Sequence, residues 1–470
     1  MDLRTAHALM RFGMGPSGGE PPPADPSAWL LDQLHQPDWA AAGLGPPPST
    51  ETGLAALRAD REDRRAARQP DPEMQGGAMQ GGAMQGGPVR GGATQSGPVA
   101  QPPPSPGQQR SRALYRAEGL AAVARAVATR TPFRERLVWF WTNHFTVSLR
   151  RGQCAAVAGA FVQEAIRPHV TGKFQDMLLA VMRHPAMLLY LDNAGSVGPA
   201  SMGGQRSRRG LNENLARECL ELHTVSPAAG YTQADVTAFA RILTGWSIEL
   251  NNDPPGFMFR PRIHEPGEQT LMGRHFPDGE AGGVEALRFL AGHPATHRFL
   301  ASKLVCHFVS DTPPAGAVRR IEGILRDTGG DLGVAAAGLA GLEEAWAPGT
   351  KFRTPLDLMV ASFRALQVPL DPLPPFLAIL AGLGQPLWTA PAPNGWSDVA
   401  ADWSGPEAMM RRIDWAFAVS GRIGDRDPMV LADATLGPLV RPTTRDAMAH
   451  AGSRREAMTL LLTSPEFQRR

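Results

Sequence analysis

The stretch FRERLVWFWTNHF, at residues 133–145, carries the clearest indication of the fold class. Wound as a helix at about 100° per residue, it places Phe133, Leu137 and Phe140 on one face together with His144. A helix face built from large apolar side chains packs against other elements, so we expect this helix to lie in a core. The histidine then points inward, where a polar ring must be hydrogen-bonded or ligated.

Helix starts of one kind recur along the chain. A capping residue is followed by proline, which costs little in the first turn because its missing N–H would have been unpaired anyway. The five places are Thr131-Pro132, His184-Pro185, His293-Pro294, Thr354-Pro355 and Ser464-Pro465. Segments in which apolar and polar residues alternate, as in a half-buried strand, are scarce. We expect at most a short β-hairpin around residues 257–259. We therefore predict an all-α fold, a large multi-helical globular domain.

Composition divides the chain into three parts. For residues 1–66 we predict an N-terminal helical segment that packs on the main domain. Residues 67–109 form a Gly/Pro/Gln-rich insert with a repeated MQGGA motif, which cannot bury enough apolar surface to offset the entropy of ordering, so we predict disorder there. Residues 110–470 predict the main multi-helical domain.

Charge, cysteines and hydropathy restrict the classes of function. The formal net charge of +2 argues against strong attraction to nucleic acid, so no nucleic-acid partner is expected. The cysteines Cys154, Cys219 and Cys306 contain no CxxC pair and fit a reducing compartment. The sequence shows no secretory signal and no run of about 18 apolar residues. We expect a cytoplasmic protein without a membrane span.

Polar side chains gather in the stretch LNENLARECLELH, at residues 211–223. On a helix, Glu218 and Glu221 share a face beside a stripe that contains Leu215 and Leu222. Two carboxylates at this spacing can bind a metal, share a proton or clamp a guanidinium group. The alternative is a solvated face stabilised by intrahelical ion pairs through Arg217.

The inward histidine and the two carboxylates form the candidate catalytic set of His144, Glu218 and Glu221. One histidine with two carboxylates suits a divalent metal such as Mn, Fe or Zn. Without a metal, the same three groups suit general acid–base chemistry. A core histidine with ordinary hydrogen bonds is the alternative for His144. The chain has no HExxH, ExxH or GxxxxGK[ST] motif, so zinc-protease, di-iron and P-loop functions lack support.

A series of short phrases resembles the bacterial domain-of-unknown-function 1800 family. These phrases follow one another in order over nearly the whole chain, so the resemblance covers the chain and not one segment. The phrases are RFGMGP at 11–16, FWTNHF at 140–145, HPAMLLYLDN at 184–193, NEN through HT at 212–224, YTQADV at 231–236, LTGW at 243–246, KL at 303–304, FVSD at 308–311, GQPL at 384–387, GW at 395–396 and SPEF at 464–467.

The resemblance implies a polar site but no particular reaction, because the family has no established activity. The shared phrases are rich in Asn, His, Asp and Glu, which favours a functional site over a generic core. They imply substrate-binding roles for Asn143, Asp192, Asn214, Arg217 and His223. Many relatives carry export signals, which implies an exported location as the alternative to the cytoplasm.

Gene neighbourhood in the family implies a partner. Genes of these proteins often lie beside those of the domain-of-unknown-function 1501 family, which resembles sulfatases and phosphatases.

The residues and the resemblance together leave three hypotheses for the function. The protein is an enzyme with a metal-assisted or acid–base site between helices, a non-enzymatic accessory or scaffold protein that works with such a neighbour, or a protein whose buried polar groups form a purely structural network.

Elemental analysis tests the metal hypothesis. Protein purified without chelators should contain close to one equivalent of Mn, Fe or Zn if His144, Glu218 and Glu221 hold an ion, because a dedicated site is near-stoichiometric. Less than about 0.2 equivalents would exclude the metal site.

Overall fold

The computed structural model describes residues 1–17, 21–36, 45–67, 109–206, 210–347, 349, 351–422 and 426–470. Helix dominates this part of the chain, with twenty α-helices and two small strand pairs, which confirms the predicted all-α class. The insert predicted to be disordered lies outside the described residues, apart from residues 67 and 109 at its ends.

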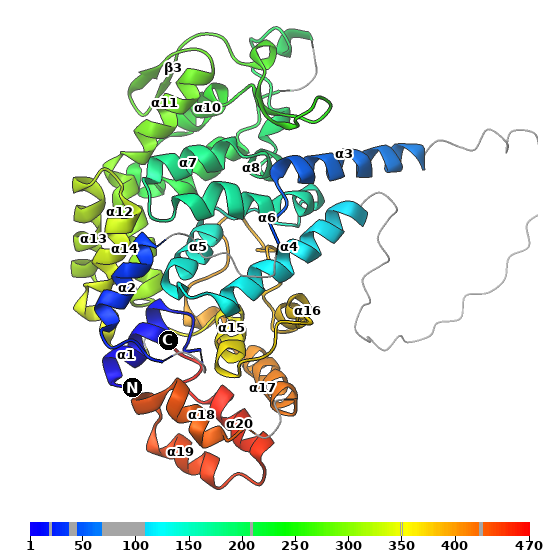
Figure 1. Cartoon of the computed structure of the whole chain (residues 1–470). Helices are drawn as coiled ribbons and strands as arrows, with labels where there is room; N and C mark the ends of the chain where they lie inside the picture. The colour runs from blue at the N-terminus through cyan, green and yellow to red at the C-terminus, as the bar shows by residue number, and fades with distance from the viewer. Residues whose placement is uncertain are drawn as a thin grey trace, which may run out of the picture.

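The N-terminal helices lie against helices from the middle of the chain. Helix α2 contacts α5 and α14, and α3 runs beside α4 (Figure 1). The bounds of the N-terminal and central helices are α1 (Leu3–His7), α2 (Pro26–His35), α3 (Thr50–Ala66), α4 (Gln109–Ala128), α5 (Pro132–His144), α6 (Ala158–Phe161), α7 (Phe174–Arg183), α8 (Pro185–Tyr190), α12 (Pro294–Phe308), α13 (Ala315–Asp327) and α14 (Leu332–Ala340). Together they enclose the main hydrophobic core, to which Phe12, Phe133 and Phe308 contribute.

Two hairpins accompany α9 (Asn214–Glu218), α10 (Gln233–Ile242) and α11 (Glu280–Ala291) at one end of the molecule. Strands β1 (Trp246–Glu249) and β2 (Gly256–Phe259) form the expected antiparallel pair. The second pair, β3 (Gln269–Leu271) and β4 (Arg274–Phe276), was not anticipated. Its strands are too short for a periodic signal, and its two-residue turn at Met272 and Gly273 has positive φ at both positions, as tight hairpins require.

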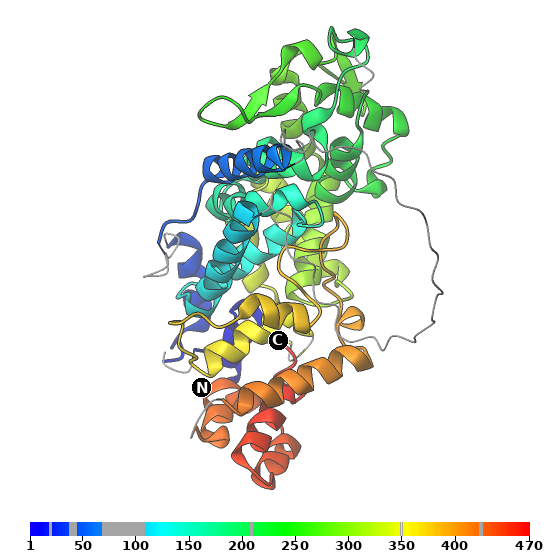
Figure 2. The same ribbon diagram turned by 90° about the vertical axis from the view of Figure 1, so that its right-hand side faces the viewer.

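The C-terminal helices form a second, smaller core at the opposite end (Figure 2). The helices are α15 (Pro355–Ala365), α17 (Pro406–Ser420), α18 (Pro428–Thr435), α19 (Pro442–Ala449) and α20 (Arg454–Thr463), whereas α16 (Phe376–Gly382) packs in the main core. Leu358 and Ala361 of α15 belong to this core, whereas Val360 and Phe363 of the same helix belong to the main core. Helix α15 therefore joins the two.

Four of the five capping-residue and proline pairs start helices as predicted. Pro132, Pro185, Pro294 and Pro355 begin α5, α8, α12 and α15. The prediction at Ser464 is wrong, because this residue is the C-cap of α20 and Pro465 opens only a turn. The capping-residue and proline pattern serves a tight turn as well as a helix start, so sequence alone does not separate the two.

The 211–223 stretch winds differently from the regular helix that was expected. After α9 it continues as a π-helix over Cys219–His223. The wider turn changes the register, so that Leu220 is fully buried and Leu222 is only half-buried. The predicted leucine stripe therefore holds for Leu215, which is fully buried, but not for Leu222.

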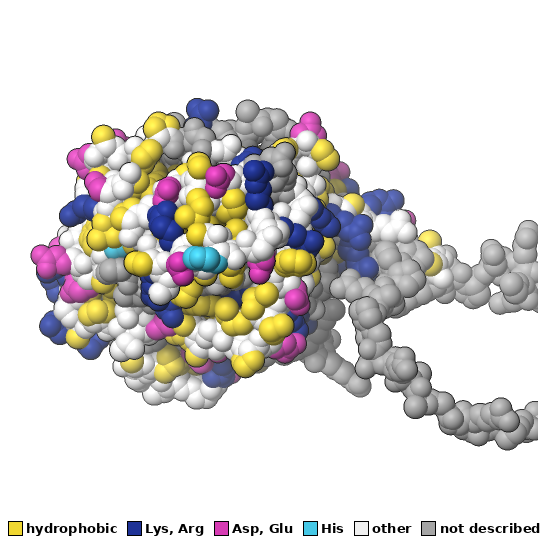
Figure 3. All heavy atoms as spheres, turned by 90° about the horizontal axis from the view of Figure 1, so that it is seen from below, with side chains coloured by type: hydrophobic (Ala, Val, Ile, Leu, Met, Phe, Trp, Pro, Cys, Tyr) yellow, Lys and Arg dark blue, Asp and Glu magenta, His cyan; other side chains and the backbone are white. Residues whose placement is uncertain are grey.

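Charges of both signs share the molecular surface. On the face that the C-terminal helices present, basic and acidic side chains are intermixed with hydrophobic ones, and no large area carries a single sign (Figure 3). Within the described part of the chain, no helix has the length and apolar character needed to cross a membrane.

Truncation of the two leucines tests the register of the 211–223 stretch. Leu215→Ala should lower the free energy of unfolding by about 2–5 kcal/mol, because it opens a cavity in the core. Leu222→Ala should cost much less, since its side chain is already partly exposed. Urea unfolding of both variants measures the difference, and equal losses would show that the helix keeps a regular α-helical register.

Candidate functional site

The candidate set His144, Glu218 and Glu221 is not assembled as a metal site in this structure. Among the described residues, no group of three or more His, Cys, Asp or Glu side chains is placed to hold a metal ion. Glu218 and Glu221 are half-buried on the outer face of their stretch, whereas His144 is 3% exposed in the core. Burial and the neighbouring Glu221 raise the pKa of Glu218.

His144 lies against a second histidine instead. Its Nε2 is 3.2 Å from the carbonyl oxygen of His223, and the two ring centroids are 5.9 Å apart. Burial lowers the pKa of both rings, to about 3 for His223, and the nearby charge of Lys303 adds to the effect. Both histidines are therefore neutral members of the core at ordinary pH, packed among Phe145 and Trp141.

Two of the predicted substrate-binding residues take part in surface interactions of α9. Arg217 pairs with Glu213 one turn earlier at 2.9 Å, and Glu213 also accepts hydrogen bonds from Gln233 and Thr237 of α10. This arrangement matches the intrahelical ion-pair alternative and fastens α9 to α10. Asn214 is exposed at the start of α9.

Asp192 lies in an open surface groove. It forms an ion pair with Arg151, and the groove also contains Asn212, Glu213 and Arg260. The groove is wide and contains side chains of both charges, so its polar groups do not define one binding or catalytic site.

Asn143 is the predicted residue that lies on the wall of a cavity. Its side-chain amide donates to the carbonyl oxygen of Trp396 at 2.8 Å and accepts from the Trp396 backbone N–H at 2.7 Å. This pair of hydrogen bonds fixes the 395–398 loop over α5. Gly395 is needed there, since its φ is +80° and an added Cβ would lie 2.5 Å from the Asn143 carbonyl oxygen.

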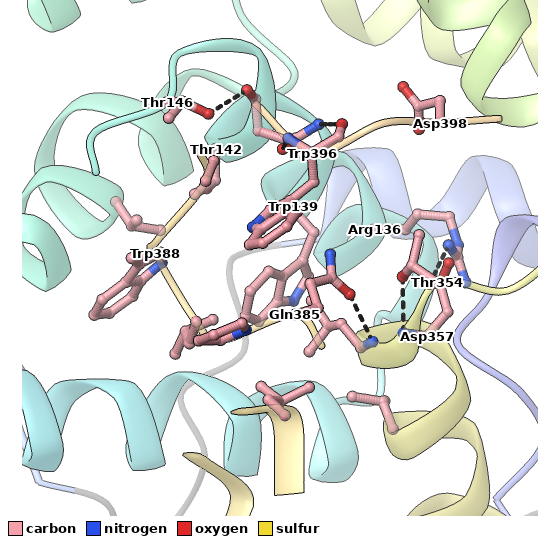
Figure 4. Close-up of a pocket in the computed structure, with 18 of the residues that line it drawn as sticks. Arg136, Trp139, Thr142, Thr146, Thr354, Asp357, Gln385, Trp388, Trp396 and Asp398 are labelled. Carbon is pink, nitrogen blue, oxygen red and sulfur yellow. Dashed lines mark hydrogen bonds and ion pairs between the residues drawn. The ribbon is translucent and has the colours of Figure 1, made fainter. Parts of the chain in front are cut away.

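The cavity lies between α5, α15 and the chain segment that joins α16 to α17. Its volume is about 100 Å³. Figure 4 shows Trp139 near the middle, Trp388 at one side, and the ion pair of Arg136 with Asp357 at the other. The wall is mainly apolar, with a few polar groups set into it, as is usual for small-molecule sites.

Arg136 and Asp357 form a buried ion pair on the cavity wall. Arg136 Nη1 lies 2.8 Å from Asp357 Oδ1, and Arg470 Nε lies 3.3 Å from the other carboxylate oxygen. The remaining guanidinium nitrogens of Arg136 donate to the carbonyl oxygen of Gly13. Burial alone would raise the pKa of Asp357, but the two arginines hold it far below its ordinary value.

Cationic groups outnumber carboxylates around this pair. Burial lowers the pKa of Arg353 to about 9 and that of Arg136 to about 10, and the mutual repulsion of the cluster's arginines contributes to both effects. The cationic side chains grouped here by charge interactions are Arg11, Arg136, Lys303, Lys351, Arg353, Arg412 and Arg470, and the carboxylates are Asp311, Asp357 and Asp398. Of these groups, Arg136, Asp357 and Asp398 line the cavity itself, and the other cations do not.

A histidine–aspartate pair also lines the cavity. His307, near the end of α12, has Nδ1 at 2.6 Å from Asp398 Oδ1. Burial lowers the pKa of His307 to about 4. Burial alone would raise the pKa of Asp398, but His307, Lys303 and Lys351 lower it to about 2. At neutral pH the imidazole is therefore neutral and the carboxylate is ionised.

Apart from Asn143, the polar groups that meet at this cavity were not predicted from the sequence. Asp357 follows Thr354 at the start of a helix and reads as an ordinary first-turn carboxylate; Thr354 does accept a hydrogen bond from its backbone N–H at 3.2 Å. His307 and Asp398 are 91 residues apart, so no local spacing connects them. The one available signal was that Asp311 and Trp396, close to these two residues, belong to the family phrases.

Comparison with known proteins identifies the family alone. Comparison with curated proteins found no match, and comparison with solved structures found none either. The model of the family described as a protein of unknown function (DUF1800) matches residues 7–469. The chain therefore belongs to this family over essentially its whole length.

Proposed function

We propose that the protein is an enzyme in which His307, oriented by Asp398, acts as a general base on a small molecule bound in the cavity. The observation that carries the proposal is the state of the two ring nitrogens. Nδ1 is held by Asp398 at 2.6 Å, and Nε2 is buried without a hydrogen-bond partner among the described residues. A buried polar atom without a partner is costly, so its retention favours a functional role.

The tautomer of His307 follows from the charge of its neighbour. An ionised carboxylate can only accept a hydrogen bond, so Nδ1 must carry the single proton of the neutral ring. The lone pair is then on Nε2, where it can take a proton from a bound molecule. The positive charge that forms on the ring is stabilised by Asp398, as in other histidine–carboxylate pairs.

The packing around His307 favours this role. Its ring lies against Phe140 and Phe308, with centroid distances of 5.2 and 4.9 Å, which fixes its orientation and excludes water from its faces. Asp398 is held in turn, because its backbone carbonyl oxygen accepts from Lys351 Nζ at 2.6 Å and Lys351 pairs with Asp311. The base therefore needs little reorganisation to react.

Replacement of the base tests the proposal. A panel of short carboxylic acids, esters and amides is incubated with the protein in D₂O and followed by NMR, which detects both exchange at carbon and bond cleavage. His307→Gln should reduce turnover about 10²- to 10⁴-fold, because the amide cannot accept the proton. Asp398→Asn should also reduce it, by favouring the wrong tautomer.

The pH profile and a matched variant serve as controls. Turnover by the unaltered protein should persist as pH falls through 6 and decline only towards about 4, where Nε2 becomes protonated. His275→Gln, which changes an exposed histidine on β4, should leave turnover unchanged. Full activity in His307→Gln, or no turnover across the panel, would contradict the proposal.

The accessory role remains a separate proposal that rests on the family resemblance. In it, the protein works with a sulfatase- or phosphatase-like member of the domain-of-unknown-function 1501 family. Co-purification of the two proteins from a co-expressing strain tests it. The catalytic proposal does not depend on that result.

A further inference from the structure

We infer that the cavity binds the carboxylate of a short organic acid, through the indole N–H groups of Trp139 and Trp388 and the hydroxyl of Thr142. The inference rests on the cavity of the proposed function but concerns recognition and not catalysis. It names a ligand class that the histidine–aspartate pair alone does not define.

Unpartnered hydrogen-bond donors converge on this cavity. Trp139 Nε1, Trp388 Nε1 and Thr142 Oγ1 are all buried and have no hydrogen-bond partner among the described residues, and all three residues line the cavity. An indole N–H can only donate, so the missing partner must present acceptors. By contrast, the amides of Asn143 and Gln385 on the same wall already bond to backbone groups.

The backbone at Trp388 supports the assignment. Its φ is +52°, in a left-handed region that a bulky side chain rarely adopts, although the residue is only 9% exposed. Its carbonyl oxygen accepts from the Leu149 N–H at 2.8 Å, which holds the strained turn in place. Such strain persists where the surroundings over-determine it, and it gathers at ligand sites. Here it places an indole N–H on the cavity wall.

Buried cations outnumber carboxylates around the cavity, which favours an anionic ligand although Asp357 and Asp398 stand on its wall. Asp357 is neutralised by Arg136 and Arg470, and Asp398 by the lysines beside it, while further buried arginines surround Asp357. A bound anion would offset this excess of buried positive charge. A carboxylate offers two acceptor oxygens in one plane, which suits a cavity lined by flat indole rings.

Volume limits the size of the ligand. A cavity of about 150 Å³ accommodates benzene, so this one, at about 100 Å³, accepts a group of roughly four to six non-hydrogen atoms. Acetate, propionate and lactate have that size. The same carboxylate could belong to a free short acid or to the end of a longer molecule, and the experiment below separates the two sources.

Calorimetry of matched acids and amides tests the inference on the full-length protein. Acetate, propionate and lactate should bind at least tenfold more tightly than acetamide, propionamide and lactamide, because the amides carry no charge. Inorganic phosphate should bind more weakly than the acids, since a tetrahedral dianion does not fit a flat slot. A longer dicarboxylate or a peptide carboxyl terminus that binds better than acetate would identify the end of a larger molecule as the source.

Thr142→Val removes one donor while keeping the shape of the side chain. Acid binding should weaken about 10- to 100-fold, the effect of losing a hydrogen bond to a charged group. Thr389→Val is the matched control, because the Thr389 hydroxyl donates to the Pro386 carbonyl oxygen and does not line the cavity. Thermal unfolding of both variants shows whether they are folded, and the acid–amide comparison on the unaltered protein is decisive without them.

The inference about carboxylate binding and the proposal about catalysis by His307 can be contradicted separately. Acids that bind to His307→Gln as they do to the unaltered protein support the inference, even if no acid is turned over and the catalytic proposal falls. Equal affinity for acids and amides, or no binding of the acids at millimolar concentration, would overturn the inference. Turnover of uncharged esters without any preference for a carboxylate would overturn it while leaving the catalytic role of His307 intact.

Discussion

The ion pair between Arg136 and Asp357 is the interaction on which the rest of the structure depends. It joins α5 to α15, and through the carbonyl oxygen of Gly13 it also fixes the N-terminal loop. Arg364 of α15 holds the same loop from the other side, at the carbonyl oxygen of Gly15. Removal of either member of the pair would leave an uncompensated buried charge, which is strongly destabilising.

Buried arginines take the place of regular backbone pairing in this core. Arg11 donates to the carbonyl oxygens of Phe308, Val309 and Ala347, which lie at the ends of α12 and of the 3-10 turn Glu343–Trp346. A guanidinium group presents five donors in a plane, so one side chain can satisfy several carbonyl groups that a helix end leaves unpaired. The result is a rigid shell of buried arginines with a cavity beside it, and His307 and several hydrogen-bond donors line that cavity.

The two histidine environments differ in what surrounds the ring. His144 and His223 lie among aromatic side chains, and no carboxylate of the described residues is hydrogen-bonded to either ring. His307 is equally enclosed but has a carboxylate bonded to one ring nitrogen. A carboxylate on one ring nitrogen fixes the tautomer and orientation of His307, as it cannot for His144 or His223; His264 has a comparable partner in Asp278, but His307 is the one that lines the cavity.

Sequence by itself determined the helical class, most of the proline-marked helix starts and the inward direction of His144, because these depend on local periodicity and on the unpaired N–H groups of a first helical turn. It also led from the family phrases to Asn143, which lines the cavity. Only the tertiary structure decided that His144 meets His223 and that Asp357 and Asp398 meet Arg136 and His307. Those meetings join residues 79 to 221 positions apart, and no local pattern encodes contacts made by helix packing.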